Sequence, residues 1–354
     1  MSAAVGSGGS GAGVGGGAGF GRTRLAPTPS GFLHLGNVLS FAITAALARN
    51  TGARILLRID DLDRERVVPD YVQDIFDSLR YMEIPWDEGP RDYEEFEREY
   101  SQVHRMSLYR KALELLRESG EVFACECSRA EIARVARRGE APEGLRSDVR
   151  AKEGDAGLFA EEAYPGTCGS KGISLDRESV SWRLRTDPVK EMMCTDLSGT
   201  ITKAAVPPSM KDFIIRKKDG HPAYQLASVV DDDYFGIDLV VRGNDLWPST
   251  LAQLYLSQFL PESHFAASQF HHHGLLLAPS ALSAKEDRPG IGDATKERKL
   301  SKSAGATSVR YLRQQGQTRE AIYMLIAQML GCGNGRPVRN FEELAEAAGG
   351  GGMF

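Results

Sequence analysis

The sequence predicts an α/β fold built on a doubly wound parallel sheet, with an inserted subdomain and a short helical part near the carboxyl end. Short apolar stretches typical of buried strands alternate with longer stretches that carry apolar residues at helical spacing. Polar, turn-forming segments follow the first two strands, and ligands bind at such carboxyl ends in doubly wound sheets. The 354 residues exceed the usual size of one compact domain, so two or three units are expected.

The first third of the chain contains the elements on which this prediction depends. The first strand leads into the loop PTPSG, and the second leads into the acidic run Asp60–Asp63. Pro69 marks the first turn of a helix, because proline is tolerated at that position. The expected elements are strands at 23–26, 54–59 and 122–124, and helices at 37–49, 69–81 and 93–118.

The amino-acid composition and the hydrophobic periodicity change after Cys125. Residues 131–162 are rich in Ala, Gly, Glu and Arg with weak periodicity, which predicts an insertion. Before this point the predicted elements already alternate as strand, helix, strand, helix, strand. The segments after it are therefore expected to extend the hydrophobic core that these elements form. They are sheet-like segments at 182–186 and 196–202, core segments at 213–216, 227–230 and 238–242, a helix at 247–260, a strand at 270–277, a polar loop at 278–308, and helices at 311–315 and 319–330.

Composition excludes several classes of protein. Lys and Arg number 43 against 48 Asp and Glu, a formal charge of −5, which excludes a strongly basic, histone-like binder but not a local basic surface for RNA. Five cysteines, an odd number, do not fit a secreted disulfide framework. No apolar run reaches the length of a membrane span, so a cytoplasmic protein without a membrane partner is expected.

Glycine is concentrated at the amino end, where residues 1–21 hold 10 of the 38 glycines. Two formal matches to G-x-G-x-x-G lie there, beginning at Gly6 and Gly11. A dinucleotide-binding loop requires a preceding strand and a following helix, and neither is predicted. A flexible Gly/Ser tail is therefore the favoured interpretation, and it is not a signal peptide.

The segment Arg24–Asn37, RLAPTPSGFLHLGN, carries the first candidate for chemistry. Its prolines and Gly31 predict a sharp loop, after which His34-Leu-Gly36-Asn37 begins a helix. A helix amino terminus favours phosphate, and a His and an Asn three residues apart can both face it. Gly36 would let a base pack flat against the backbone. The alternative is a capped core helix that happens to contain a histidine.

The second candidate is Lys299-Leu-Ser-Lys302-Ser303 in the long polar loop. Two lysines among serines suit a polyphosphate. The alternative is a solvated charge run.

Together the two motifs resemble the H-I-G-H and K-M-S-K-S motifs of the class I aminoacyl-tRNA synthetases. This resemblance implies a Rossmann-type catalytic domain that joins an amino acid to ATP as an aminoacyl-adenylate, with Mg2+ accompanying ATP. Such phosphoryl chemistry needs positioning and positive charge rather than a protein nucleophile. It implies catalytic roles for His34, Asn37 and Lys302, and ATP binding by His34, Gly36, Asn37, Lys299 and Lys302.

Finer motifs resemble the glutamyl branch of that family: R-x-A-P-T-P-S-G, RIDDLDRER, AYQLASVVDDDYFG and VVRGNDL. The resemblance implies that Arg24 and Arg242 bind the carboxylates of L-glutamate, for which an Arg fork is a natural partner. It places Thr28 beside the amino acid and Tyr224 within hydrogen-bonding reach of it. Asp60 stands where the branch has Glu, facing the substrate ammonium, so its arm is one methylene shorter.

The cysteines offer a metal site. Cys125-x-Cys127 is separated from Tyr164-x-x-x-Cys168 by the insertion, and buried free thiols are the alternative interpretation. The pattern resembles the zinc site of glutamyl-queuosine tRNA(Asp) synthetases, which implies one structural Zn2+ held by Cys125, Cys127, Tyr164 and Cys168. Cys194 and Cys332 are expected to be ordinary thiols. The run His271–His273 is interpreted as structural.

The resemblance also bears on the final substrate. The 354-residue chain leaves 52 residues after Lys302, too few for the anticodon-binding domain of a full glutamyl-tRNA synthetase. This architecture resembles the glutamyl-queuosine tRNA(Asp) synthetases, which activate glutamate and transfer it to queuosine at the wobble position. The partners implied are ATP, L-glutamate and the queuosine-carrying anticodon loop of tRNA(Asp), bound by a monomer through a locally basic cleft. The candidates for that basic cleft are Lys211, Arg216, Lys217 and Lys218.

Two other functions stay open. A minimal glutamyl-tRNA synthetase would charge tRNA(Glu), and a catalytically inactive nucleotide- or RNA-binding paralogue would explain Asp60. The predicted domains are a Gly-rich tail (1–21), the first half of the catalytic domain (22–124), an inserted zinc subdomain (125–195), the second half of the catalytic domain (196–280), the KLSKS loop with a helical stem-contact region (281–335) and a tail (336–354).

Overall fold

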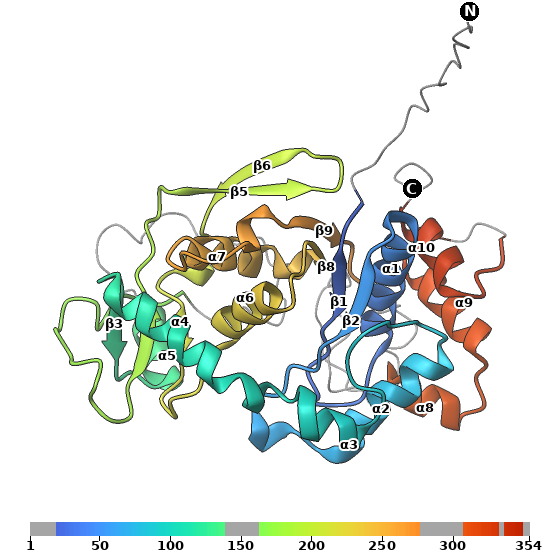
Figure 1. Cartoon of the computed structure of the whole chain (residues 1–354), viewed down its shortest axis with the longest axis horizontal. Helices are drawn as coiled ribbons and strands as arrows, with labels where there is room; N and C mark the ends of the chain where they lie inside the picture. The colour runs from blue at the N-terminus through green and yellow to red at the C-terminus, as the bar shows by residue number, and fades with distance from the viewer. Residues whose placement is uncertain (1–18, 139–162, 277–306, 333–335, 350–354) are drawn as a thin grey trace, which may run out of the picture.

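A computed structural model describes residues 19–138, 163–276, 307–332 and 336–349 (Figure 1). The Gly-rich run and the KLSKS motif lie outside the described residues, so the predictions for them are not tested. Among the described residues no helix has the length and apolar composition needed to cross a membrane.

A parallel sheet forms the centre of the molecule. Strand β1 (Arg22–Leu25) pairs in parallel with β2 (Arg54–Leu57), and β9 (Gln269–His273) pairs in parallel with both β8 (Leu239–Gly243) and β5 (Glu191–Asp196). The Asp238 N–H donates to the carbonyl oxygen of Arg22 at 3.1 Å, which brings β1 beside β8. The strand β6 (Ile201–Ala205) adds an antiparallel edge to β5. The predicted parallel α/β sheet is confirmed.

Helices cover this sheet. Helix α1 (Leu35–Thr51) connects β1 to β2 and is buried along most of its length, which is why its sequence is apolar on nearly every face. Figure 1 shows α1 flanked by α9 and α10, with α6 and α7 at the other end of the sheet. The other helices are α2 (Pro69–Tyr81), α3 (Tyr93–Glu95), α4 (Met106–Glu118), α5 (Arg129–Arg138), α6 (Tyr224–Tyr234), α7 (Trp247–Ser257), α8 (Val309–Gln314), α9 (Arg319–Met329) and α10 (Phe341–Gly349).

A second, antiparallel sheet corrects one prediction. Residues 122–124 were expected to form the third strand of the parallel sheet. Instead β3 (Val122–Cys125) pairs antiparallel with β4 (Ser181–Leu184), which pairs with β7 (Ile214–Arg216). The place beside β1 belongs to β8, a strand more than a hundred residues later. A four-residue apolar strand carries no local signal for its partner, so strand order was misassigned.

The long helix expected at 93–118 is broken. A short turn of helix α3 (Tyr93–Glu95) and a wide turn (Phe96–Tyr100) end at Ser101, and α4 (Met106–Glu118) begins only after a 3-10 turn. At Ser101 the backbone is extended, with ψ at 139°. Its Oγ donates to Asp61 Oδ2 at 2.5 Å, and Gln102 N–H donates to Asp61 Oδ1 at 2.8 Å. A distant carboxylate therefore replaces the helical hydrogen bonds at this point.

The bounds of several shorter elements also differ from those predicted. The sheet-like segment expected at 196–202 contains the turn between β5 and β6, where Asp196 accepts from Ser198 and Thr200. The core segment 227–230 lies within α6, and the strand expected at 270–277 ends at His273. The predicted domain boundaries remain a prediction.

Candidate active site

Two buried arginines meet near the carboxyl ends of neighbouring strands. Arg24 is the next-to-last residue of β1 and Arg242 that of β8, and Arg24 Nη1 donates to the carbonyl oxygen of Val241 at 3.3 Å. Arg242 Nη1 donates to Gln253 Oε1 at 2.8 Å and to Thr250 Oγ1 at 3.3 Å. The two strands thus place two guanidinium groups at one edge of the sheet.

Arg242 has fewer hydrogen-bonded guanidinium nitrogens than Arg24 within the described part of the chain. Its Nε and Nη2 are buried and have no hydrogen-bond partner among the described residues. Burial lowers the pKa of Arg242 to about 10, and the nearby positive charges of Arg24 and Arg58 act in the same direction. Orphaned buried donors on a cation are costly unless an anion reaches them. The site is therefore suited to a carboxylate ligand.

The other residues expected at the glutamate site lie around these arginines. Tyr224 begins α6, is 39% exposed, and acts electrostatically on Arg242. Thr28 lies exposed in the loop after β1, and its carbonyl oxygen accepts from Ser30 N–H at 2.9 Å. The Asp60 N–H donates to the carbonyl oxygen of Pro27 at 2.9 Å, so Asp60 is held against the same loop.

The HLGN motif forms the amino terminus of α1. The Gly36 N–H donates to His34 Nδ1 at 3.1 Å, and the His34 N–H donates to Asn37 Oδ1 at 3.1 Å. This reciprocal pair is a capping box, which satisfies backbone donors at the helix start. The helix-cap interpretation of the motif is therefore correct as local structure, and the same cap holds His34 and Asn37 at a helix terminus suited to phosphate.

The chain just after the KLSKS motif returns to this terminus. Val309 N–H donates to the carbonyl oxygen of Leu33 at 2.8 Å, and Ser308 forms a β-bridge with His34. Ser308 follows Lys302 by only six residues. Lys299 and Lys302 themselves lie outside the described residues.

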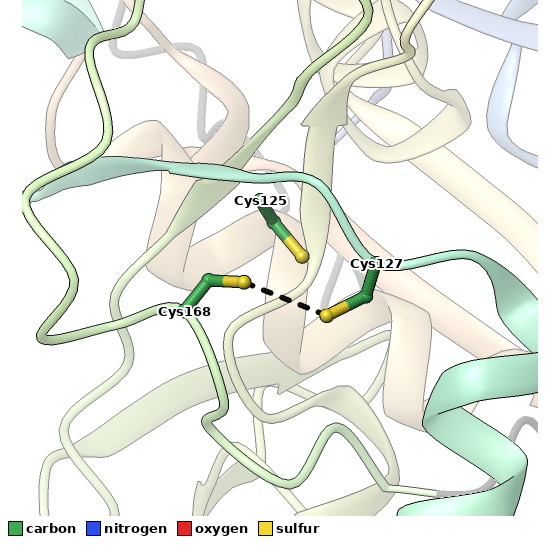
Figure 2. Close-up of side chains that lie close together, drawn as sticks. All are labelled: Cys125, Cys127 and Cys168. Atoms are coloured by element: carbon green, nitrogen blue, oxygen red, sulfur yellow. Dashed lines mark hydrogen bonds between the residues drawn. The ribbon is translucent and has the colours of Figure 1, made fainter.

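Three thiols converge beyond the carboxyl end of β3, as Figure 2 shows. The sulfur atoms of Cys125, Cys127 and Cys168 lie within 4.8 Å of one another, and the Cys127 and Cys168 sulfurs are 3.5 Å apart. Tyr164 joins them, because its hydroxyl accepts from Cys168 N–H at 2.9 Å and hydrogen-bonds the Cys125 thiol. In a tetrahedral zinc thiolate site the sulfurs are roughly 3.8 Å apart. The donor set and its spacing fit a single metal ion.

The surroundings of the cluster affect its ionisation. Burial raises the pKa of the Cys127 thiol to about 11, and the adjacent Cys168 and Cys125 thiols add to this shift. Burial opposes ionisation of Cys125 too, but hydrogen bonding from Tyr164 and the positive charge of Arg183 lower its pKa. The Arg183 guanidinium lies 3.7 Å from the ring centre of Tyr164 and so fixes that side chain.

The histidine run lies on a core strand, as interpreted from the sequence. His271–His273 form the end of β9, between β8 and β5. His272 Nε2 lies 2.8 Å from Thr250 Oγ1, and burial together with Arg242 lowers the pKa of His272 to about 3. Burial also lowers the pKa of His271 and His273, so the run is neutral, and His272 is the member that lies beside Arg242.

Comparison with known proteins decides the family. Residues 22–285 match the family model described as tRNA synthetases class I (E and Q), catalytic domain. The chain belongs to this family. A protein of Symbiobacterium thermophilum named Glutamyl-Q tRNA(Asp) synthetase is 34% identical over 314 residues, which cover 87% of this chain and 86% of that protein. The resemblance to the glutamyl-queuosine synthetases is thereby confirmed.

Glutamate–tRNA ligases are related as well. Glutamate–tRNA ligase 2 of Syntrophus aciditrophicus is 31% identical, over 92% of this chain but 61% of that protein. The crystal structure of a glutamate-tRNA synthetase from Elizabethkingia anophelis matches with a TM-score of 0.65 at 22% identity, over 93% of this chain and 65% of that one. This likeness shows the fold of the class I synthetases.

Sequence reasoning missed three residues of the candidate site. Gln253 supports Arg242, and Arg58 and Asp232 connect Arg24 to Asp60. A signal existed for Arg58, because an arginine inside the apolar stretch RILLRI has to be paired when buried. Asp232 stands within a run of three aspartates, which does not indicate which one faces the site.

Gly36 allows a test of the cap. A Cβ atom on residue 36 would lie 3.0 Å from His34 Cε1 and 3.1 Å from His34 Nδ1, closer than ordinary contacts. The family resemblance implies that His34 acts on ATP. We therefore expect Gly36→Ala to turn the His34 ring and to lower kcat for glutamate-dependent ATP–pyrophosphate exchange by up to about 100-fold, the cost of a displacement of about 1 Å. Melting temperature should change by only a few degrees. A wild-type kcat in the folded variant would show that the His34 position is unimportant.

Proposed function

We propose that this synthetase activates L-glutamate with ATP and Mg2+ and transfers the glutamyl group to queuosine at the wobble position of tRNA(Asp). Support comes from the relative named Glutamyl-Q tRNA(Asp) synthetase and from the match to the class I catalytic domain. The protein is expected to act as a monomer in the cytoplasm.

In the activation step, the glutamate carboxylates would be held by Arg24 and the unpaired donors of Arg242. Asp60 would accept from the ammonium, and Thr28 and Tyr224 would lie at the sides. The phosphates of ATP would lie at the amino terminus of α1, near His34 and Asn37, with Lys299 and Lys302 brought in from the following loop. These groups would position the α-carboxylate for attack on the α-phosphorus of ATP, from which pyrophosphate leaves, and would stabilise the developing negative charge.

The four-residue cluster of three thiols and one phenol is the observation that carries the assignment to the queuosine-modifying branch. The pattern C-x-C…Y-x-x-x-C suggested this branch from the sequence, and Cys125, Cys127, Tyr164 and Cys168 lie together in the structure. The donor set is that of a structural Zn2+ site. Such an ion would hold β3 against the turn 164–168 and would take no part in the reaction.

The choice of tRNA tests the proposal. Purified protein is incubated with ATP, labelled glutamate and, in parallel, tRNA(Asp) with queuosine, tRNA(Asp) without it, and tRNA(Glu). Label is expected only on tRNA(Asp) with queuosine. Label at the 3′ end of tRNA(Glu) would instead establish a glutamyl-tRNA synthetase. Absence of glutamate-dependent ATP–pyrophosphate exchange would establish an inactive paralogue.

Lys302 provides the corresponding variant. We expect Lys302→Ala to reduce ATP–pyrophosphate exchange by on the order of 100-fold, because one charged contact to the reacting phosphates is lost. Lys203→Ala, which removes an exposed lysine on β6, is the matched control and should keep the wild-type rate. Exchange by Lys302→Ala at the rate of Lys203→Ala would reject the assignment of KLSKS to ATP.

A further inference from the structure

Four buried charges form a chain across the floor of the glutamate site. Arg24 Nε lies 3.1 Å from Asp232 Oδ1, and Arg58 Nη1 lies 2.6 Å from the same oxygen. Arg58 then holds Asp60 with two further donors, Nε to Oδ1 at 2.7 Å and Nη2 to Oδ2 at 3.1 Å. Charges alternate along the order Arg24, Asp232, Arg58, Asp60. We call this set the four-charge chain.

Burial makes the four-charge chain interdependent. The side chains of Arg24 and Asp232 are 6% and 0% exposed, and those of Arg58 and Asp60 are 2% and 11% exposed. Removing one member of a buried ion pair strands its partner without water, which costs far more than the pair itself contributes. Loss of Arg58 would therefore strand Asp60 and leave Asp232 paired with Arg24 alone.

The neighbouring Asp231 does not substitute for these contacts. Its two oxygens accept from the Arg105 guanidinium, the Tyr109 hydroxyl and the Gln102 amide. Asp231 Oδ2 is 4.0 Å from Arg58 Nε, so it faces Arg58 as an additional negative charge. Arg58 is thus the guanidinium that Asp60 and Asp232 share.

The ends of the four-charge chain coincide with the two charged ends of the proposed substrate. Arg24 lies with Arg242 where carboxylates would bind, and Asp60 lies where the ammonium would bind. Both oxygens of Asp60 are engaged by Arg58, and the fork of Arg58 is fixed by Asp232. The position of the Asp60 carboxylate is therefore determined by Arg58 as well as by its own short arm.

We propose that Arg58 is a positioning and specificity-determining residue: it holds Asp60 in place as an ionised acceptor for the substrate ammonium and joins it, through Asp232, to the carboxylate-binding Arg24. This inference rests on the proposed function. In this role Arg58 acts through Asp60 and Asp232, whose carboxylates its three nitrogens engage. Its role is to let the site distinguish an amino acid from a dicarboxylate that lacks the amino group.

Electrostatics support this role. Burial raises the pKa of Asp60, Asp231 and Asp232 add to that rise, and Arg58 opposes it by charge and by hydrogen bonding. Without Arg58, two or three carboxylates would share a buried site with too little positive charge, and one of them would take up a proton. A protonated Asp60 offers the ammonium a much weaker partner.

Glutarate, which is glutamate without its amino group, is the probe. The KM for glutamate, the KM for ATP and the inhibition constant of glutarate are measured by ATP–pyrophosphate exchange for the wild type, Arg58→Met and Arg58→Lys. We expect Arg58→Met to raise the KM for glutamate by on the order of tenfold or more, a usual effect of disrupting a charged contact. The inhibition constant of glutarate should rise less than the KM for glutamate, since glutarate has no ammonium for Asp60, and the KM for ATP should change less than about threefold, as expected for a distant, independent site.

Variants at Asp60 and Arg54 complete the design. Arg58→Lys keeps the charge but loses the fork, so an intermediate effect is expected. Arg54→Met is the matched control and should behave as wild type. It removes an exposed arginine at the start of β2, which is paired with Glu88. In an Asp60→Asn background, Arg58→Met should no longer change the preference for glutamate over glutarate, because the two residues act as one unit.

The outcomes separate cleanly. A folded Arg58→Met variant with the wild-type preference for glutamate over glutarate would overturn the inference and leave Arg58 as a structural residue. If Arg58→Met does not fold, the comparison of Arg58→Lys with Asp60→Asn decides in the same way. A wild-type protein without glutamate-dependent exchange would reject the proposed function itself, which is a different result.

Discussion

Replacing Arg242 by methionine is expected to weaken glutamate binding severely and, at the same time, to stabilise the protein in the absence of substrate. The Arg242 guanidinium is fully buried, and two of its nitrogens have no partner among the described residues. Lowering the pKa from 12.5 to about 10 corresponds to a cost on the order of 3 kcal/mol at neutral pH, where the group is charged in both states. Methionine fills a similar space without this cost.

The loss of binding should be large because the same unpaired donors would receive the substrate carboxylate. Removing one partner of a buried, hydrogen-bonded charge pair costs about 2–5 kcal/mol of binding free energy. We expect the KM for glutamate to rise by a factor of 30 or more, on the basis of about 1.4 kcal/mol per tenfold. The free energy of unfolding should rise by about 1–3 kcal/mol, as measured by urea denaturation without ligand.

Arg105 is the matched control for the stability effect. It is also buried, but it has a full set of partners, with two nitrogens on Asp231 and a third on the carbonyl oxygen of Tyr100. Arg105→Met should therefore lower the free energy of unfolding, because it strands Asp231. An Arg242→Met variant that is less stable than wild type, or that activates glutamate normally, would contradict the proposed role of Arg242.

The parts of the fold that the sequence predicts well are those with local causes. Helix α2 begins at Pro69 and ends at Tyr81 as expected, since proline marks its first turn and its apolar residues recur at helical spacing. Helix α1 ends before Gly52, which adopts φ of 78° as a helix terminator. The same locality applies to His34 and Asn37, whose capping box lies within four consecutive residues.

Features that depend on distant partners were not predictable. The break at Ser101 is caused by Asp61, 40 residues earlier, and no local pattern announces it. Asp232 and Arg58 are 174 residues apart in sequence, so their pairing follows only from the way β2 and α6 pack together. The partner of β3 is likewise a matter of tertiary packing. The sequence therefore indicates the groups that touch substrate more readily than the groups that hold them.

Removal of the proposed zinc ion is expected to have the largest effect on stability in the antiparallel sheet region. The cluster residues Phe123, Cys125, Tyr164 and Cys168 form a small separate core there, with few apolar neighbours. Small cores of this kind usually need a metal or disulfides, and a structural zinc site contributes several kcal/mol of folding free energy. We expect purified protein to carry about one zinc per chain, and chelation or Cys125→Ala to remove it.

The expected loss is local, because β1 and β2 pack in a large core with α1, and β8 and β9 contribute to a second large core that also covers β4 and β7. Hydrogen exchange should accelerate in β3, in the turn 164–168 and in β4, while β1, β8 and β9 keep their protection. Cys194→Ala is the matched control, since Cys194 is a buried thiol on β5 that takes no part in the cluster, and it should retain the metal. A wild-type protein without metal, or a Cys125→Ala variant with unchanged exchange in β3, would mean that the thiols are ordinary core residues. Retention of glutamate-dependent exchange by the metal-free protein would further show that the ion acts on the fold of this region and not on the adenylate chemistry.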